Sequence, residues 1–266
     1  MNSDSEIASI LTEYEGISLE EVNRASLMRI KDNKYLFSVQ HLPALLSLVK
    51  NEYRVMDIDG YRTQYYHTCY FDTDGHEMYF KHHRGIANRH KVRIRRYGAS
   101  DLHFLEVKCK NAKGVTNKKR VRTDGMDHSR VLKEKEFLHA YSPYTGEDIV
   151  PTMENTFYRI TLVNQRQTER VTLDHDLRFS SKHSGEELTL PGIAIAEIKY
   201  EGVLAGSAMH AAMRKLQIST SRFSKYAIGM ALLHADLKQN RFKRRVRKVH
   251  QINDDYQPNT KPSKHA

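Results

Sequence analysis

Charged and apolar residues alternate along several short segments of this chain, and that period of two constrains its fold most. In HKVRIRRYG (residues 90–98), an extended backbone places Lys91, Arg93 and Arg95 on one face and Val92 and Ile94 on the other. The apolar face needs a packing partner, whereas the neighbouring cations repel one another unless water or an anion lies against them. The pattern therefore predicts a β-strand with one buried and one strongly cationic face.

The same alternation recurs in four further segments, and in most of them the charged face opposes a compact apolar one. The opposing apolar residues include Leu105 and Val107, Val171 and Leu173, and Ala196 and Ile198. The charged faces comprise Glu106, Lys108 and Lys110 in residues 103–110, Lys118 and Arg120 in 116–122, Arg170, Thr172 and Asp174 in 169–175, and Glu197 and Lys199 in 194–201.

The number and spacing of these segments predict an α+β protein built around a closed, antiparallel, eight-stranded β-barrel with flanking helices. Turn signals such as Asp74-Gly75 and Lys113-Gly114 separate several of the strands. We expect strands over residues 34–39, 62–72, 89–97, 103–110, 116–122, 156–163, 169–175 and 194–201, and helices over 41–53, 128–139, 204–215 and 222–247.

The chain divides into three expected parts: a helical lead-in over 1–24, one body over 25–236, and a basic helix end and tail over 237–266. Ser18 and Glu21 fit a capping box in the lead-in. The tail holds nine Lys or Arg and two Asp, so it carries most of the net charge of +11. We interpret residues 241–248 as a solvated helix end or disordered arm, with contact to a polyanion as the alternative. The mildly basic body does not predict a specific nucleic-acid partner.

Composition argues against a membrane protein and against a disulfide-stabilised one. No apolar run approaches the roughly 20 residues that span a bilayer, and the acidic start lacks the basic region of a secretory signal. The two cysteines, Cys69 and Cys109, are expected to be small buried side chains. These observations predict a cytoplasmic protein without a transmembrane segment.

Two arrangements fit the charged faces. They could be solvated outer surface, or they could line the lumen of the barrel while the apolar faces pack outward against helices. Charges inside a protein must be paired or must hold a ligand of opposite sign. A lumen with many Lys and Arg and few carboxylates would suit a polyanion together with a divalent cation. The persistent positive bias favours the lumen.

Several ordered motifs resemble the VTC domain, the catalytic domain of the vacuolar transporter chaperone polyphosphate polymerase and its bacterial relatives. That domain belongs to the triphosphate tunnel (CYTH-like) superfamily. The resemblance extends from about Leu27 to about Leu233, and it implies a tunnel of eight antiparallel strands that binds a nucleoside triphosphate and the growing polyphosphate. The motifs are YHTCYFDTDGHEMYFKHHRG (66–85), NRHKVRIRRYG (88–98), FLEVKCK (104–110) and SRFSKYAIG (221–229).

Carried over motif by motif, the resemblance also implies roles for individual residues. A divalent metal, Mn²⁺ or Mg²⁺, would be held by Glu197. In SRFSKY the family usually has lysine at both basic positions, and here the first is Arg222. The implied catalytic residues are Arg93, Arg95, Lys108, Arg159, Arg170 and Glu197, and the implied phosphate-binding residues are Lys34, Lys91, Lys118, Lys199, Arg222 and Lys225.

The implied activity is transfer of the γ-phosphoryl group of ATP to inorganic polyphosphate, with release of ADP. Hydrolase and cyclase members of the superfamily carry an ExExK strand, whereas the matching positions here are Ile30, Asp32 and Lys34. This departure favours a polymerase over the alternative of a metal-dependent triphosphatase. A second alternative is a non-catalytic polyphosphate-binding protein, against which the retained Glu197 argues.

Overall fold

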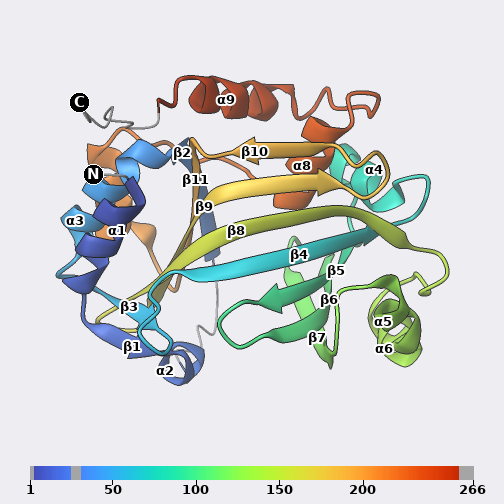
Figure 1. The fold of residues 1–266 in the computed structure, drawn as a ribbon, viewed down its shortest axis with the longest axis horizontal. Coiled ribbons are helices and arrows are strands. Elements are labelled where there is room, and N and C mark those ends of the chain that lie inside the picture. The colour runs from blue at the N-terminus through green and yellow to red at the C-terminus, as the bar shows by residue number, and fades with distance from the viewer. Residues whose placement is uncertain (1–2, 25–30, 258–266) are drawn as a thin grey trace, which may run out of the picture.

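The structure is a computed structural model that describes residues 3–24 and 31–257, and one large sheet lies at its centre (Figure 1). The predicted boundary at residue 25 and the departure at Ile30 lie outside the described residues. Each neighbouring pair along the main path of the sheet is antiparallel, which confirms the predicted α+β class. In spatial order the path is β2 (Lys31–Ser38), β11 (Ile193–Tyr200), β9 (Glu169–Ser181), β8 (Val150–Asn164), β4 (Gln64–Asp72), β5 (Arg89–Tyr97), β6 (Leu102–Lys110) and β7 (Thr116–Thr123).

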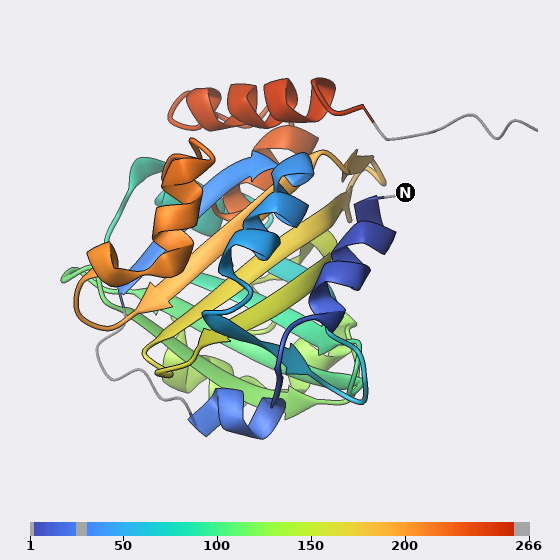
Figure 2. The same cartoon turned by 90° about the vertical axis from the view of Figure 1, so that its left-hand side faces the viewer.

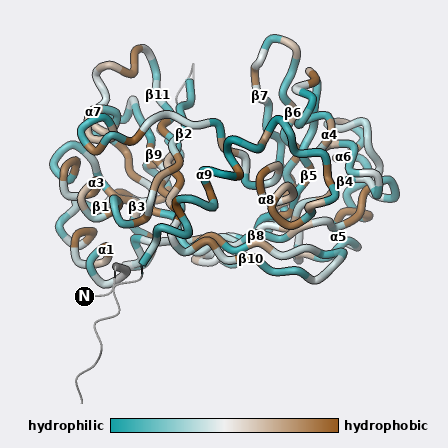
Figure 3. Tube along the Cα trace, turned by 90° about the horizontal axis from the view of Figure 1, so that it is seen from above, coloured by the Kyte–Doolittle hydropathy of each residue, from teal (hydrophilic) through white to brown (hydrophobic). Residues whose placement is uncertain are grey.

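The sheet is not closed, so the predicted closed barrel is not what the structure shows. Within residues 3–24 and 31–257, no ladder joins the two ends of the path, β2 and β7. Figure 3 shows β2, β9 and β11 on one side of the molecule and β5, β6 and β7 on the other. Both ends carry cations, including Lys31 and Lys34 on β2 and Lys118 and Arg120 on β7. Like charges on facing strands oppose pairing, which gives a physical reason for the open edge.

Three short strands, β1 (Gly16–Ser18), β3 (Tyr53–Asp57) and β10 (Glu187–Leu190), pair beside the main path.

Three helices cover the outer face of β2, β11 and β9 (Figure 2). They are α1 (Ser3–Thr12), α3 (Leu42–Val49) and α7 (Ala208–Lys215). Val171, Leu173, Ala196 and Ile198 are fully buried in the same hydrophobic cluster as α3 and α7 side chains. The predicted outward packing of these apolar faces is confirmed.

A second cluster lies on the outer face of β5 and β6. Val92, Ile94, Leu105 and Val107 are buried there with side chains of α4 (Glu77–Arg84), α5 (His128–Lys133) and α6 (Lys135–Tyr141). The charged residues that alternate with them therefore project from the opposite face, which we call the inner face. Cys69 is buried as predicted, whereas Cys109 is partly exposed.

Helix α8 (Lys225–Leu233) lies on the inner side of the sheet, because Lys225 in its first turn pairs with Asp174 of β9. Its close approach depends on Gly229. A Cβ atom there would lie 2.6 Å from Met153 Sδ and 2.7 Å from Phe179 Cδ1.

Helix α9 (Lys243–Asp254) packs on the body and crosses its upper edge (Figure 1). Phe242 and Val249 are buried in the cluster that contains α8. The side chain of Asn253 accepts a hydrogen bond from the Gly192 N–H at 3.2 Å. Residues 241–248 are therefore not a disordered arm but lead into and begin a packed helix, whose cations Lys243, Arg244 and Arg247 are exposed as the solvated alternative predicts. Residues 258–266 lie outside the described region.

The single helix predicted over 222–247 is two helices, since α8 ends at Leu233 and α9 begins at Lys243. The two segments have different patterns. Residues 225–233 are buried on nearly all sides, whereas α9 has one apolar stripe and a charged remainder. One straight helix could not bury both, so the chain reverses between them.

Of two local predictions, the capping box is confirmed and the continuous helix over 128–139 is wrong. The capping box of Ser18 and Glu21 is confirmed, because each side chain accepts a hydrogen bond from the other residue's backbone N–H as α2 (Leu19–Arg24) begins. The helix predicted over 128–139 is broken at Glu134 into α5 and α6.

In the part of the chain that is described, no helix is long and apolar enough to cross a bilayer.

Candidate functional site

Strand pairing arranges the charged residues of the inner face in rows. Lys91 of β5, Lys108 of β6 and Lys118 of β7 are direct neighbours across the sheet. On the other side, Lys34 of β2 is the direct neighbour of Glu197 of β11. The first row places three like charges side by side, an arrangement that is unfavourable without a counter-charge.

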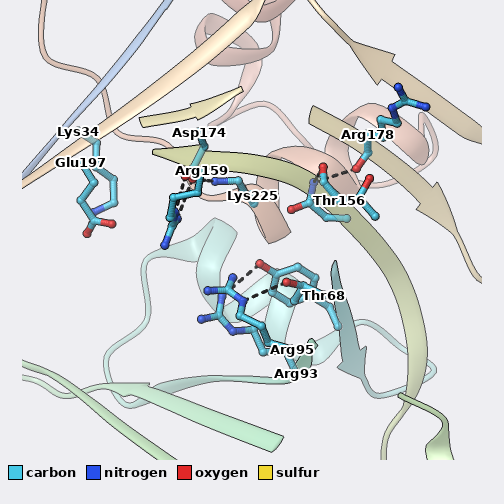
Figure 4. Close-up of polar contacts among 12 residues, drawn as sticks. Lys34, Thr68, Arg93, Arg95, Thr156, Arg159, Asp174, Arg178, Glu197 and Lys225 are labelled. Carbon is cyan, nitrogen blue, oxygen red and sulfur yellow. Dashed lines mark hydrogen bonds and ion pairs between the residues drawn. The ribbon is translucent and has the colours of Figure 1, made fainter. Parts of the chain in front are cut away.

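The two sides of the sheet act on each other electrostatically across the inner face. Desolvation and, after it, the charges of Arg93, Lys34 and Lys199 together lower the pKa of Lys108 to about 8, while Glu197 opposes this shift. Lys108 lies on β6, whereas Lys34, Lys199 and Glu197 lie on β2 and β11. Figure 4 shows Arg159 and the pair Arg93 and Arg95 pointing into the same space from opposite sides.

Glu106 of β6 is a deeply buried carboxylate of this face, with 1% of its side chain exposed. It lies 2.6 Å from Arg93 Nη2 and accepts a hydrogen bond from Lys118 Nζ at 3.1 Å. Burial alone would raise the pKa of Glu106, but Arg93, Arg95 and Lys118 hold it below its usual value. Two of the predicted phosphate ligands are thus partly neutralised by a carboxylate.

Asp174 of β9 forms a second buried group with two cations. It accepts hydrogen bonds from Arg159 Nε at 2.6 Å and Nη2 at 2.8 Å, and it also pairs with Lys225. Burial would raise the pKa of Asp174, but Arg159 and Lys225 lower it to about 2. Burial lowers the pKa of Lys225 to about 8 despite this pairing.

Glu197 is more accessible than Glu106 and Asp174, since 24% of its side chain is exposed. Its Oε1 accepts a hydrogen bond from Lys34 Nζ at 2.9 Å, and Lys34 also pairs with Asp32. Burial raises the pKa of Glu197, but Lys34, Lys199 and Lys108 outweigh it and keep the carboxylate ionised. Within the described residues, no group of three or more His, Cys, Asp or Glu side chains could hold a metal ion by itself.

The remaining cations of the inner face have no carboxylate within 4.0 Å among the described residues. Lys91 Nζ donates to Ser224 Oγ at 2.7 Å, and Arg95 Nε donates to Thr68 Oγ1 at 3.1 Å. The Arg95 guanidinium also lies 5.4 Å from the ring centre of Tyr66. Among the predicted site residues of the sheet, the cations without a carboxylate partner are Lys91, Arg95, Lys108, Arg170 and Lys199.

The structure brings together on this face the sequence-predicted site residues of the sheet and Lys225 of α8. Arg222 lies between Ser221, whose N–H donates to Lys34 O at 2.7 Å, and Ser224, whose hydroxyl accepts from Lys91 Nζ at 2.7 Å. Its charge also lowers the pKa of Arg245 of α9, in addition to burial. Sequence reasoning assigned no role to Glu106 or Asp174. The alternation placed both on charged faces, but it could not identify their cationic partners, because those come from other strands and from α8.

Comparisons with known proteins place this geometry in a family. A family model described as VTC domain matches residues 29–234. A candidate adenylate cyclase from Bacillus halodurans has 14% identity and a TM-score of 0.49, with 73% of this chain and 92% of that chain covered. A candidate adenylyl cyclase from Hippeastrum, described as having a dominant triphosphatase activity, has 15% identity and a TM-score of 0.48, with 77% and 96% covered. No curated protein matches the chain.

Proposed function

Since the chain belongs to the VTC domain family, we propose that it is a polyphosphate polymerase. It would transfer the γ-phosphoryl group of ATP to the end of an inorganic polyphosphate chain and release ADP. The inner face of the sheet would be the wall of a triphosphate tunnel. We also propose that the protein acts in the cytoplasm, where ATP is available.

The observation that carries this proposal is the excess of cations on the inner face. Lys91, Arg95, Lys108, Arg170 and Lys199 have no carboxylate partner among the described residues. Unpaired charges away from water cost several kcal/mol each, and Arg95, which is 7% exposed, is such a charge. A ligand that carries a series of negative charges would lower this free-energy cost for all the cations of the inner face.

Phosphoryl transfer needs positioning and charge neutralisation more than covalent help. The acceptor in this reaction is a terminal phosphate oxygen, which is already ionised at neutral pH, so the site needs no general base. Arginine forks and lysine point charges would hold the triphosphate and the acceptor chain in line and stabilise the charge of the transferred group. The proposed catalytic cations are Arg93, Arg95, Lys108, Arg159 and Arg170, and the proposed phosphate-binding residues are Lys34, Lys91, Lys118, Lys199, Arg222 and Lys225.

Glu197 is the residue that would hold a divalent cation. Hard cations take oxygen ligands, and Mg²⁺ is commonly held by one or two carboxylates together with substrate phosphates. A single ionised carboxylate beside a phosphate-binding surface fits that pattern. Mn²⁺ or Mg²⁺ would neutralise charge on the phosphate oxygens. Lys34, which donates to Glu197 at 2.9 Å, would then exchange the carboxylate for a phosphate oxygen.

A metal-dependent triphosphatase is the second candidate. The observation in its favour is that Lys34 pairs with Asp32 as well as with Glu197, so two carboxylates lie beside one lysine. Only the acceptor differs between the two reactions, because the hydrolase transfers the phosphoryl group to water.

The proposal is tested by incubating the protein with ATP and Mn²⁺ and separating acid-stable polymer on a gel. Lys108→Ala should abolish polymer formation, whereas Lys119→Ala, an exposed lysine on the opposite face of β7, should leave it near the wild-type level. Normal polymer from a folded Lys108→Ala variant would remove the inner face from the reaction. Polyphosphate binding without ADP formation would favour the non-catalytic alternative.

A further inference from the structure

A basic groove lies along the exposed side of α9, where Lys243, Arg244 and Arg247 are accessible. Its volume is about 560 Å³. A smaller pocket of about 220 Å³ shares Asn240 with it and adds Arg84, Lys238 and Arg241. The basic groove is lined by Asn240, Lys243, Arg244, Arg247, Lys248 and Gln251.

The cations of the basic groove are not neutralised. Within the described residues, none of Lys243, Arg244, Arg247 and Lys248 lies within 4.0 Å of a carboxylate, although helical cations elsewhere, such as Lys81, form ion pairs of the i,i+4 type. The acidic residues of α9 and its C-cap come only at its end. The charge of Arg244 also lowers the pKa of Lys248, in addition to burial. The cations that line the groove therefore repel one another, and an anion bound there would relieve that repulsion.

The groove is connected to the inner face by further cations. The pKa of His82 falls to about 2 because of burial and the charges of Lys91, Arg89 and Arg245. Lys91 belongs to the inner face and Arg245 to α9. Arg222 in turn lowers the pKa of Arg245, after burial. Arg222 is two residues from Ser224, which accepts a hydrogen bond from Lys91 Nζ at 2.7 Å. Cations therefore continue from Lys91 of the inner face through Arg222 to Arg245 of α9.

We propose that the basic groove is a second binding site for inorganic polyphosphate, on which the polymer lies where it extends beyond the inner face. The inference rests on the proposed function, because only a polymer substrate or product would need to occupy both surfaces. It also accounts for the unpaired cations on a helix that has no catalytic group.

The lining of the groove distinguishes polyphosphate from other polyanions. Val246, Val249 and Ile252 point into the hydrophobic core, so α9 has no apolar face left to insert into a membrane. The groove has no aromatic side chain, whereas single-stranded nucleic acids are usually bound by stacking of bases on aromatics. A chain of phosphates without bases needs only the cations that are present.

The test compares two variants that lose the same charge. One carries Lys243→Gln, Arg244→Gln, Arg247→Gln and Lys248→Gln, which leaves the buried stripe of α9 intact. The control carries Lys133→Gln, Arg166→Gln, Arg214→Gln and Lys215→Gln, which are exposed cations on other elements. Thermal unfolding verifies that both are folded. Affinities for tripolyphosphate, long-chain polyphosphate and single-stranded DNA are then measured at low salt.

The α9 variant should lose roughly tenfold or more in affinity for long-chain polyphosphate, because several phosphate contacts disappear. Its affinity for tripolyphosphate should change little, and the control should retain both. Equal losses in the two variants, or DNA bound at α9 as tightly as polyphosphate, would overturn the inference. If the α9 variant loses affinity for long-chain polyphosphate but the wild-type protein forms no polymer from ATP, only the polymerase proposal is wrong. If polymer forms and the α9 variant binds polyphosphate with wild-type affinity, only the proposed second site is wrong.

Discussion

Arg93 and Glu106 lie directly opposite each other on β5 and β6, and Glu106 accepts a hydrogen bond from Arg93 Nε at 2.8 Å. The pair is buried, with 19% of the Arg93 side chain and 1% of the Glu106 side chain exposed. Arg93 therefore has a structural partner before any phosphate arrives, whereas Lys108 on the neighbouring strand has none within the described residues. This difference separates two kinds of cation on the inner face.

Removing Arg93 should destabilise the protein, and removing Lys108 should not. Arg93→Ala leaves the buried carboxylate of Glu106 with one cation, Lys118, and the Tyr97 hydroxyl at 3.4 Å. Breaking a buried pair in this way typically costs about 3–5 kcal/mol. Lys108→Met removes an unpaired charge and should keep or raise the free energy of unfolding. Urea denaturation of the two variants measures the contrast. Equal stabilities would show that the carboxylate of Glu106 does not depend on Arg93.

The lowered pKa values of Lys108 and Lys225, both about 8, predict how stability depends on pH. An unfolded lysine has a pKa near 10.4, so the unfolded state binds more protons between about pH 8 and pH 10.4. The contribution of these lysines to the free energy of unfolding therefore rises with pH through that window. Lys108→Met should flatten the rise, as measured by urea denaturation at intervals of pH. An unchanged slope in Lys108→Met would contradict the prediction for that residue.

The same pKa values predict the pH dependence of ligand binding. A phosphate ligand favours the charged lysine, so affinity for tripolyphosphate should fall as pH rises above 8, by at most about tenfold per unit for each lysine. Lys108→Arg, which stays charged, should reduce this dependence, and Lys108→Arg with Lys225→Arg should remove most of it. Titration calorimetry from pH 7 upward measures the profile. A wild-type affinity that does not change with pH would place these lysines away from the phosphates.

Gly229→Ala should separate α8 from the sheet. The added Cβ would meet Met153 Sδ at 2.6 Å and Phe179 Cδ1 at 2.7 Å, and overpacking of this kind typically costs about 1–3 kcal/mol. Lys225 would move with the helix, so tripolyphosphate binding should weaken as well. Gly206→Ala, where no atom lies within 4 Å of the added Cβ, is the matched control. Thermal unfolding that is identical in the two variants would show that α8 adjusts without cost.

Truncation after Leu237 should destabilise the protein, whereas truncation after Gln257 should not. The shorter chain loses Phe242 and Val249, both buried, and each such side chain contributes roughly 1.5–3 kcal/mol when fully buried. The comparison is made by thermal unfolding of both truncated chains. If both unfold at the wild-type temperature, α9 does not contribute to the core.

Local patterns in the sequence predicted the strands well, because alternation reports directly which side of a strand is buried. Val92 with Ile94, and Val171 with Leu173, are buried as that pattern predicts. Closure of the sheet was not predictable in the same way, since it depends on whether β2 and β7, far apart in the sequence, can pair. Cations on both edges oppose such pairing.

The ion pairs of the site could not be predicted, because the paired side chains lie far apart in the sequence. Asp174 is neutralised by Arg159 from the neighbouring strand and by Lys225 from α8, and no spacing in the sequence indicates this. The break between α8 and α9 has a similar origin, because the sequence alone predicts a continuous helix while packing requires the chain to reverse.

Glu197→Gln tests the role of the carboxylate. The substitution keeps the shape and removes the charge that Lys34 pairs with, so tripolyphosphate should bind at least as tightly as in the wild type. Turnover of ATP should be lost, and excess Mn²⁺ should restore little of it. Asp32→Asn, which removes the other carboxylate bound to Lys34, is the control and should retain most of the activity if Glu197 alone holds the metal. Full activity of Glu197→Gln would exclude that role.

The most direct test of the polymerase proposal is the balance of products from ATP and Mn²⁺. Orthophosphate, ADP and acid-stable polymer are measured in the same reaction over time. A polymerase forms ADP together with a lengthening polymer and little orthophosphate, and we expect this result for the wild-type protein. If orthophosphate appears in step with ADP and no polymer forms, the polymerase proposal is wrong and the protein is a triphosphatase.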